Sequence, residues 1–196
     1  MTGPAGAYGP VGVSGAAAGT GPAVVSGAAA WTGPGAGDPS LAEEIVALLT
    51  RQRRTIAVAE SLTGGLLGAT ITAVPGASVV FRGGVVAYAT DLKAALLGVP
   101  AELLAARGAV DPDVARAMAA GVQQRLGAEI GVATTGVAGP DPAEGKPPGT
   151  VHIAVRAGGS TVIKSLALSG SRENIRRQTV ARCLRLMWSV IWEEGP

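Results

Sequence analysis

The feature of this sequence that most restricts its fold is the alternation of short apolar runs with helix-forming segments. The run "TIAVA" (Thr55–Ala59) has the length and composition of a buried strand, and so does "EIGVATTG" (129–136). Between them, "VVFRGGVVAYAT" (79–90) predicts one strand, or two paired strands interrupted by Gly83 and Gly84. Parallel strands need crossover connections, usually helical, so this order predicts a largely parallel sheet.

Helical segments occupy the intervening stretches. They are predicted at 40–54, from about Gly64 to 74, at 91–98, at 100–108, at 111–127 and at 172–191. Asp111 is a suitable N-cap, and Pro112 takes the favoured first helical position. The runs 150–157 and 160–168 flank a Gly-Gly pair and predict a closing hairpin. The expected fold class is therefore α/β, a three-layer α/β/α sandwich with a mixed, largely parallel sheet.

The first 39 residues differ in composition from the rest of the chain. They are rich in glycine, alanine and proline, carry no charge before Asp38, and lack the periodicity of a helix or strand. Ordering such a segment is entropically costly, and it has few large side chains to bury in return. Residues 1–39 are therefore predicted to be a disordered tail, and residues 40–196 a single folded domain.

Composition excludes several classes of function. The net charge of +2 is too small to suggest nucleic acid or a membrane surface as partner, and aromatic residues, at 3%, are too scarce for base stacking. One cysteine, Cys183, and one histidine, His152, cannot form a disulfide framework or the usual zinc cluster. No apolar run is long enough to span a membrane, and no basic residue precedes Arg51 as a secretory signal requires. A cytoplasmic protein without a metal is expected.

Polar residues follow three of the predicted strands. They are Glu60, Ser61 and Thr63 after the first, Tyr88, Thr90, Asp91 and Lys93 after the second, and Thr134, Thr135 and Gly136 at the end of the third. Ligands of open α/β sheets bind at the carboxyl ends of the strands. Ser61 and Lys93 are 32 residues apart, close to the length of one strand–helix–strand unit, so both can lie at the same edge.

A serine at this edge needs a base, because its hydroxyl is a weak nucleophile until the proton is removed. His152 lies mid-strand in "TVHIAV", far from any strand end, and is expected to be an ordinary sheet residue. Lys93 falls in the first turn of a predicted helix, where the positive end of the helix dipole disfavours the ammonium form. Lys93 can therefore serve as the base, although spacing alone favours a solvated surface lysine.

Two glycine-rich turns and two arginines complete the candidate site. "TGG" (63–65) opens a helix and "TGVAGP" (135–140) follows a strand, and such turns present N–H groups that bind phosphate or an oxyanion. Each turn on its own is more often structural. Arg172 and Arg176 share a helical face and can clamp a phosphate, the alternative being a solvated basic face.

Four segments together resemble the CinA C-terminal domain family, which includes stand-alone nicotinamide-nucleotide amidohydrolases. In order they are "AVAESLTGGLLGATITAVPGAS", "GGVVAYATDLKAALLGVP", "RGAVDPDVARAMAAGV" and "TTGVAGPDPAEGKPPGTVHIAV". The resemblance spans about residues 41–191. It implies an α/β/α sandwich, a homodimer, and hydrolysis of nicotinamide mononucleotide to nicotinate mononucleotide and ammonia without a metal or organic cofactor.

The family's motifs imply a role for each residue that matches them. Ser61 is the implied nucleophile, with Lys93 and Tyr88 as its catalytic partners. The implied substrate-binding or oxyanion residues are Thr63, Gly64, Gly65, Thr135, Gly136, Ala138, Gly139, Arg172 and Arg176.

Two positions depart from the family pattern, and two alternative functions stay open. Leu62 stands where the family usually has cysteine, and Asp111 stands where it usually has serine. Leu62 is interpreted as a change in packing beside the nucleophile. The first alternative is a non-catalytic nucleotide-binding or regulatory protein, since family members are linked by name to competence and DNA damage. The second is a serine–lysine hydrolase that acts on another amide.

Overall fold

The computed structural model describes residues 39–193, and in this part of the chain a five-stranded mixed sheet forms the middle layer. Its strands are β1 (Ile56–Glu60), β2 (Phe81–Val86), β3 (Ile130–Gly136), β4 (Thr150–Ala157) and β5 (Ser160–Ala167), in the order β2-β1-β3-β4-β5. β1 pairs in parallel with β2 and β3, whereas β4 is antiparallel to both β3 and β5. The predicted hairpin and the mixed sheet are both confirmed.

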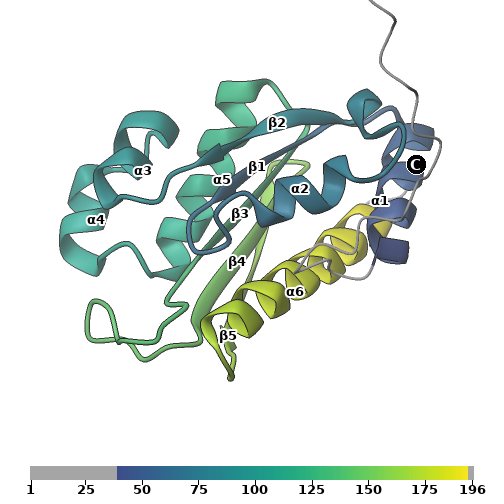
Figure 1. Cartoon of the computed structure of the whole chain (residues 1–196). Helices are drawn as coiled ribbons and strands as arrows, with labels where there is room; N and C mark the ends of the chain where they lie inside the picture. The colour runs from purple at the N-terminus through teal and green to yellow at the C-terminus, as the bar shows by residue number, and fades with distance from the viewer. Residues whose placement is uncertain (1–38, 194–196) are drawn as a thin grey trace, which may run out of the picture. The chain divides into compact units, whose positions relative to one another are not determined.

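Helices cover both faces of this sheet (Figure 1). They are α1 (Pro39–Gln52), α2 (Leu66–Thr72), α3 (Thr90–Leu97), α4 (Ala101–Arg107), α5 (Pro112–Leu126) and α6 (Arg172–Glu193), with a short 3₁₀ turn η1 (Ala77–Val79). Apolar side chains of α1, α2 and α6 pack on one face, and those of α3 and α5 pack on the other. The three-layer α/β/α sandwich is therefore as predicted.

Strand β1 shows why the sheet needs two covered faces. All five of its residues are buried, and successive side chains point to opposite sides. Val58 joins the apolar cluster of α1, α2 and α6, while Ala57 and Ala59 join the cluster of α3 and α5. A continuous apolar run of this kind is typical of a central parallel strand.

The segment around Gly83 and Gly84 forms one edge strand, β2, and not two paired strands. The register of β2 against β1 shifts between Ile56 and Ala57, so Gly83 follows a bulge and has a φ of 144°. A Cβ on Gly84 would lie 2.7 Å from Val58 Cγ2. The glycine pair therefore bends the strand without ending it.

Two other predictions concern the ends of elements. Asp111 caps α5 as expected, because its Oδ1 accepts a hydrogen bond from Asp113 N at 2.8 Å and Pro112 is the first helical residue. The predicted tail, residues 1–39, lies outside the described residues except for Pro39, which begins α1.

Between residues 39 and 193, no helix combines the length and the apolar character needed to cross a membrane.

Candidate active site

The parallel pairing of β2, β1 and β3 brings their carboxyl ends to one edge of the sheet, and Ser61 and Lys93 meet there. Ser61 directly follows β1, and Lys93 lies in the first turn of α3, the helix that follows β2. Lys93 Nζ is 3.1 Å from Ser61 Oγ. The predicted proximity of these two side chains is thus present in the fold.

Lys93 is buried, with 1% of its surface exposed, so the solvated-lysine interpretation is wrong. Its Nζ also lies 2.9 Å from Ala87 O and 3.4 Å from Tyr88 O, and it donates to both carbonyls. A neutral amine has two N–H donors and one lone pair. In that form, two donors directed at the carbonyls leave the lone pair to accept the Ser61 proton, whereas in the protonated form Nζ donates to Ser61 Oγ.

Burial and two nearby carboxylates shift the protonation of Lys93 in opposite directions, and burial is the larger effect. Burial lowers its pKa from the ordinary value of 10.5, while the negative charges of Glu144 and Asp91 partly oppose that shift. Within the described residues, no carboxylate lies within ion-pair distance of Nζ. A lysine with this environment can act as a general base.

Glu60 holds the turn that carries Ser61. Its carboxylate is buried, with 1% exposed, and accepts hydrogen bonds from Gly65 N and Leu67 N, both at 3.0 Å, and from Gly68 N at 2.8 Å. These N–H groups belong to the N-terminus of α2, where the helix dipole stabilises a negative charge. The glutamate therefore fixes α2 against the end of β1 and shapes the turn between them.

The Ser61 backbone is fixed from two further directions. Ser61 N donates to Thr134 O at 3.0 Å, which extends the β1–β3 ladder by one residue. Arg176, on α6, donates from Nε to Leu62 O at 3.1 Å and from Nη2 to Thr63 O at 2.7 Å. A side chain from the far end of the sequence thus ties down the residues that follow the serine.

Ser61 and Lys93 open onto a cavity of about 180 Å³. Its lining is polar and comes from the ends of β1 and β3, from α3, from the segment before α5, from the loop after β3 and from α6. The lining residues are Ser61, Leu62, Tyr88, Thr90, Lys93, Ala109, Val110, Thr135, Gly136, Ala138, Ala143, Glu144 and Arg172. Of the residues expected at the site, Tyr88, Thr135, Gly136, Ala138 and Arg172 are thereby gathered around the Ser61–Lys93 pair.

Arg172 and Tyr88 contact each other at the mouth of this cavity. Arg172 Nη2 donates to Tyr88 Oη at 2.7 Å, and Nη1 donates to Gly139 O at 2.7 Å. Tyr88 is 58% exposed, so this pair lies on the solvent-accessible side of the lining. Arg172 lines the cavity, whereas Arg176 donates to the Leu62 and Thr63 carbonyls and does not line it. The expectation that both arginines clamp a phosphate stays a prediction.

The backbone N–H groups expected to stabilise an oxyanion also need correction. Gly64 N donates to Ser61 O at 3.0 Å and Gly65 N donates to Glu60, so neither is free. Val137 N donates to Thr150 O, and alternate residues of an antiparallel pair turn their N–H groups away from the partner strand. Gly136 N–H therefore points away from β4, toward the Ser61 side. Leu62 N–H has no intramolecular acceptor within the described residues.

Thr63 and His152 lie beside the cavity without lining it. Thr63 is fully buried, and its Oγ1 is 2.7 Å from Thr134 Oγ1. His152 Nδ1 is 2.9 Å from Ser165 Oγ on β5, as expected of an ordinary sheet residue. Its position was misjudged, however, because it lies opposite Thr135 at the end of β3. Burial lowers its pKa.

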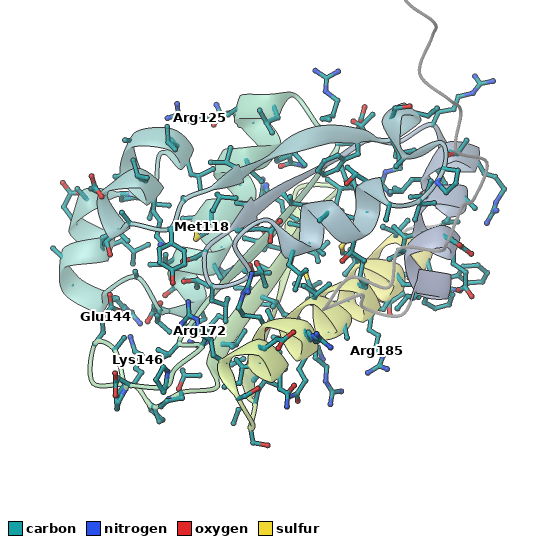
Figure 2. All side chains as sticks on the ribbon, viewed as in Figure 1. Met118, Arg125, Glu144, Lys146, Arg172 and Arg185 are labelled. Atoms are coloured by element: carbon teal, nitrogen blue, oxygen red, sulfur yellow. The ribbon has the colours of Figure 1, made fainter. Side chains whose placement is uncertain are left out.

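Glu144 is the cavity residue that the sequence analysis missed. It lies on the loop between β3 and β4, and its carboxylate accepts hydrogen bonds from Ala109 N at 2.9 Å and Val110 N at 3.1 Å. Figure 2 shows Glu144 and Lys146 together on this loop. A lone glutamate in a Pro/Gly-rich stretch carries no periodicity, so only the folded loop reveals its position.

Several known proteins are similar to this chain in sequence and in fold. A family model described as the CinA C-terminal domain matches residues 38–191. A CinA-like protein of Frankia casuarinae is 54% identical over 153 residues, which are 78% of this chain and 35% of the relative. A CinA-like protein of Gemmatimonas aurantiaca is 50% identical over 143 residues, 72% of this chain and 33% of the relative. The chain thus spans about a third of the length of the curated relatives it matches.

Solved structures agree with these relationships. A competence/damage inducible protein of Agrobacterium tumefaciens superposes with a TM-score of 0.75 at 35% identity, covering 78% of this chain and 94% of that chain. A CinA superfamily protein of Klebsiella pneumoniae superposes with a TM-score of 0.77 at 29% identity, covering 79% and 98%. The match over residues 38–191 and these identities show that the chain belongs to the CinA C-terminal domain family.

Proposed function

We propose that this protein is a metal-independent amidohydrolase that converts nicotinamide mononucleotide to nicotinate mononucleotide and ammonia. The observation that carries the proposal is the contact between Lys93 Nζ and Ser61 Oγ at 3.1 Å, with the lysine buried and with no carboxylate of residues 39–193 within ion-pair distance. A structural lysine is seldom buried unless its charge is paired. A buried, unpaired lysine beside a serine is what a serine–lysine hydrolase requires.

In the first half of the reaction, neutral Lys93 removes the proton from Ser61 Oγ as this oxygen attacks the carboxamide carbon. The carbonyl oxygen becomes an oxyanion, for which Leu62 N–H and Gly136 N–H are the available donors, each worth about 3 kcal/mol in comparable sites. The Lys93 ammonium then gives its proton to the amide nitrogen. The C–N bond breaks, ammonia leaves, and the acyl group stays on Ser61.

In the second half, a water molecule takes the place of ammonia. Lys93, neutral again, removes a proton from the water while its oxygen attacks the acyl carbon. Collapse of the second tetrahedral intermediate breaks the bond to Ser61 Oγ, which regains its proton from Lys93. Nicotinate mononucleotide leaves, and the starting state is restored.

Arg172 is the proposed contact for the 5′-phosphate of the substrate. Arg172 is one of the residues that line the cavity, and its guanidinium donates to the exposed Tyr88 side chain. Guanidinium groups bind phosphate through two parallel hydrogen bonds. Arg176 instead acts through the backbone, by holding Leu62 and Thr63.

Ammonia release from nicotinamide mononucleotide by the purified protein tests this function. We expect turnover in the wild type and loss of turnover in Ser61→Ala. Tight binding of the nucleotide without ammonia release would instead support a regulatory, nucleotide-binding protein, in keeping with the competence and damage names of the structural relatives. Faster release from another amide in the same assay would indicate a different substrate.

A further inference from the structure

Glu144 contributes a fixed negative charge to the wall of the cavity. Both carboxylate oxygens accept backbone hydrogen bonds, from Ala109 N and Val110 N. The side chain retains 34% of its exposure, and Lys146 Nζ, 3.9 Å from Oε2, is its nearest cation among the described residues. A carboxylate held by two backbone N–H groups keeps one orientation.

The neighbouring backbone is shaped around this carboxylate. Gly108 has a φ of 75°, and a Cβ at that position would lie 2.3 Å from Glu144 Oε2. Ala109 is held from the other side, because Thr135 Oγ1 donates to its carbonyl at 2.7 Å. The position of the charge is therefore set by the end of β3 and the segment before α5, and not by the loop alone.

Two formal charges of opposite sign line the cavity. Glu144 lies on the β3–β4 loop and Arg172 begins α6, so they reach the cavity from different elements (Figure 2). Lys93 also lines the cavity, and burial lowers the pKa of its amine. Glu144 acts electrostatically on Lys93, whereas Arg172 contacts Tyr88 Oη and Gly139 O. This arrangement complements a ligand with a cationic group on the Glu144 side of the cavity and an anionic group on the Arg172 side.

Nicotinamide mononucleotide has this distribution of charge. Its ring nitrogen is bonded to the ribose, so the ring is a pyridinium cation, while its phosphate is an anion. Free nicotinamide is neutral. The reaction also creates a carboxylate on the ring, which a fixed negative charge in the cavity repels.

We propose that Glu144 is a specificity-determining residue whose carboxylate selects substrates that carry the carboxamide on a cationic ring. This inference rests on the proposed function for the identity of the substrate. At an effective dielectric constant intermediate between protein and water, one charge a few ångströms from the ring changes affinity by roughly tenfold. The same charge favours release of the product over the substrate.

The test must separate this charge effect from the structural role of Glu144 in holding the loop. Glu144→Gln removes the charge and keeps the size of the side chain. Lys146→Met is the matched control, because it removes the hydrogen bond from Nζ to Arg107 O at 3.2 Å and loosens the same loop while the carboxylate stays.

The experiment measures binding by calorimetry in the Ser61→Ala background, so that no turnover is needed. The ligands are nicotinamide mononucleotide and the C-nucleotide in which a neutral benzamide replaces the nicotinamide ring. They match in shape and phosphate and differ in the ring charge. We expect the cationic ligand to bind roughly tenfold more tightly than the neutral one, and the Glu144→Gln change to abolish that ratio. Lys146→Met also removes the cation 3.9 Å from Glu144 Oε2, so it should preserve or increase the ratio.

Equal weakening of both ligands by Glu144→Gln would show that the residue only positions the loop, and would overturn the inference. Binding of neither ligand to Ser61→Ala would overturn it too. A Glu144-dependent preference in a protein that releases no ammonia would contradict the proposed reaction alone. Ammonia release by the wild type together with equal affinities for the two ligands would contradict the charge selection alone.

Discussion

Lys93 and Ser61 come from different strand–helix connections, yet Lys93 Nζ is 3.1 Å from Ser61 Oγ. The same nitrogen donates hydrogen bonds to two backbone carbonyls. The carbonyls of Ala87 and Tyr88 belong to the segment between β2 and α3. The lysine is therefore oriented by the backbone that leads into its own helix. Its orientation does not depend on an acidic partner.

If these two side chains work as one unit, their removal is not additive. We expect Ser61→Ala and Lys93→Met each to reduce kcat for ammonia release by about 10³-fold or more, and the double variant to be little worse than either single one. Ser165→Ala, which removes the hydroxyl beside His152, is the control and should leave kcat unchanged. Near-normal turnover in either single variant would contradict the dyad.

The activity should depend on the neutral form of Lys93. We expect kcat/KM to rise with pH along a limb whose midpoint lies below 10.5, because burial lowers the pKa of this lysine. Asp91 raises that pKa, so Asp91→Asn should move the limb to lower pH. Asp141→Asn, on the β3–β4 loop, serves as the control. A pH profile unaffected by Asp91→Asn would show that another group controls the limb.

The same pKa shift predicts how stability depends on pH. Between the lowered pKa of the folded state and 10.5, the unfolded chain binds a proton at Lys93 that the folded chain does not, so the free energy of unfolding rises with pH. Lys93→Met lacks this contribution. The difference in unfolding free energy between wild type and Lys93→Met should rise toward pH 10.5, by at most about 1.4 kcal/mol per pH unit, and then level off. Urea titrations at several pH values measure it, and a constant difference would refute the prediction.

The two arginines of α6 should differ in their kinetic effects. We expect Arg172→Ala to raise KM for nicotinamide mononucleotide by about tenfold and to have little effect on the nucleoside that lacks the phosphate. Arg176→Ala should lower kcat for both, because it releases the Leu62 and Thr63 carbonyls beside the nucleophile. Arg185→Ala, exposed on the same helix, is the control (Figure 2). Identical kinetic profiles for the two variants would contradict this division of roles.

Glu60 should matter for stability. Glu60→Gln leaves a buried amide where three backbone N–H groups need an acceptor, and we expect a loss of about 2 kcal/mol in unfolding free energy. Glu44→Gln, on the exposed side of α1, should change the stability by less than about 0.5 kcal/mol. Thermal or urea unfolding measures both. A loss at Glu60 no larger than that at Glu44 would mean that α2 does not need this carboxylate.

Patterns that extend over many residues were predictable from the sequence. The helices, the three crossover-connected strands and the closing hairpin follow from periodicity and turn residues, and the Asp111 cap follows from a local motif. The gathering of Ser61, Lys93 and Thr135 also follows from topology, since strands that run in parallel end at one edge. The β2 bulge could not be foreseen, because it depends on the register of β2 against β1, which only the assembled sheet shows.

The order of the elements, and the position of a serine and a lysine after neighbouring strands, could be predicted from the amino-acid sequence. The folded structure was needed to show that Lys93 is buried, that Arg176 donates to the Leu62 and Thr63 carbonyls, and that Glu144 reaches the cavity. Local periodicity depends on neighbours a few residues away, which the sequence displays directly. Burial, and the partners of a charged side chain, depend on residues distant in the chain, and these meet only when the layers pack together.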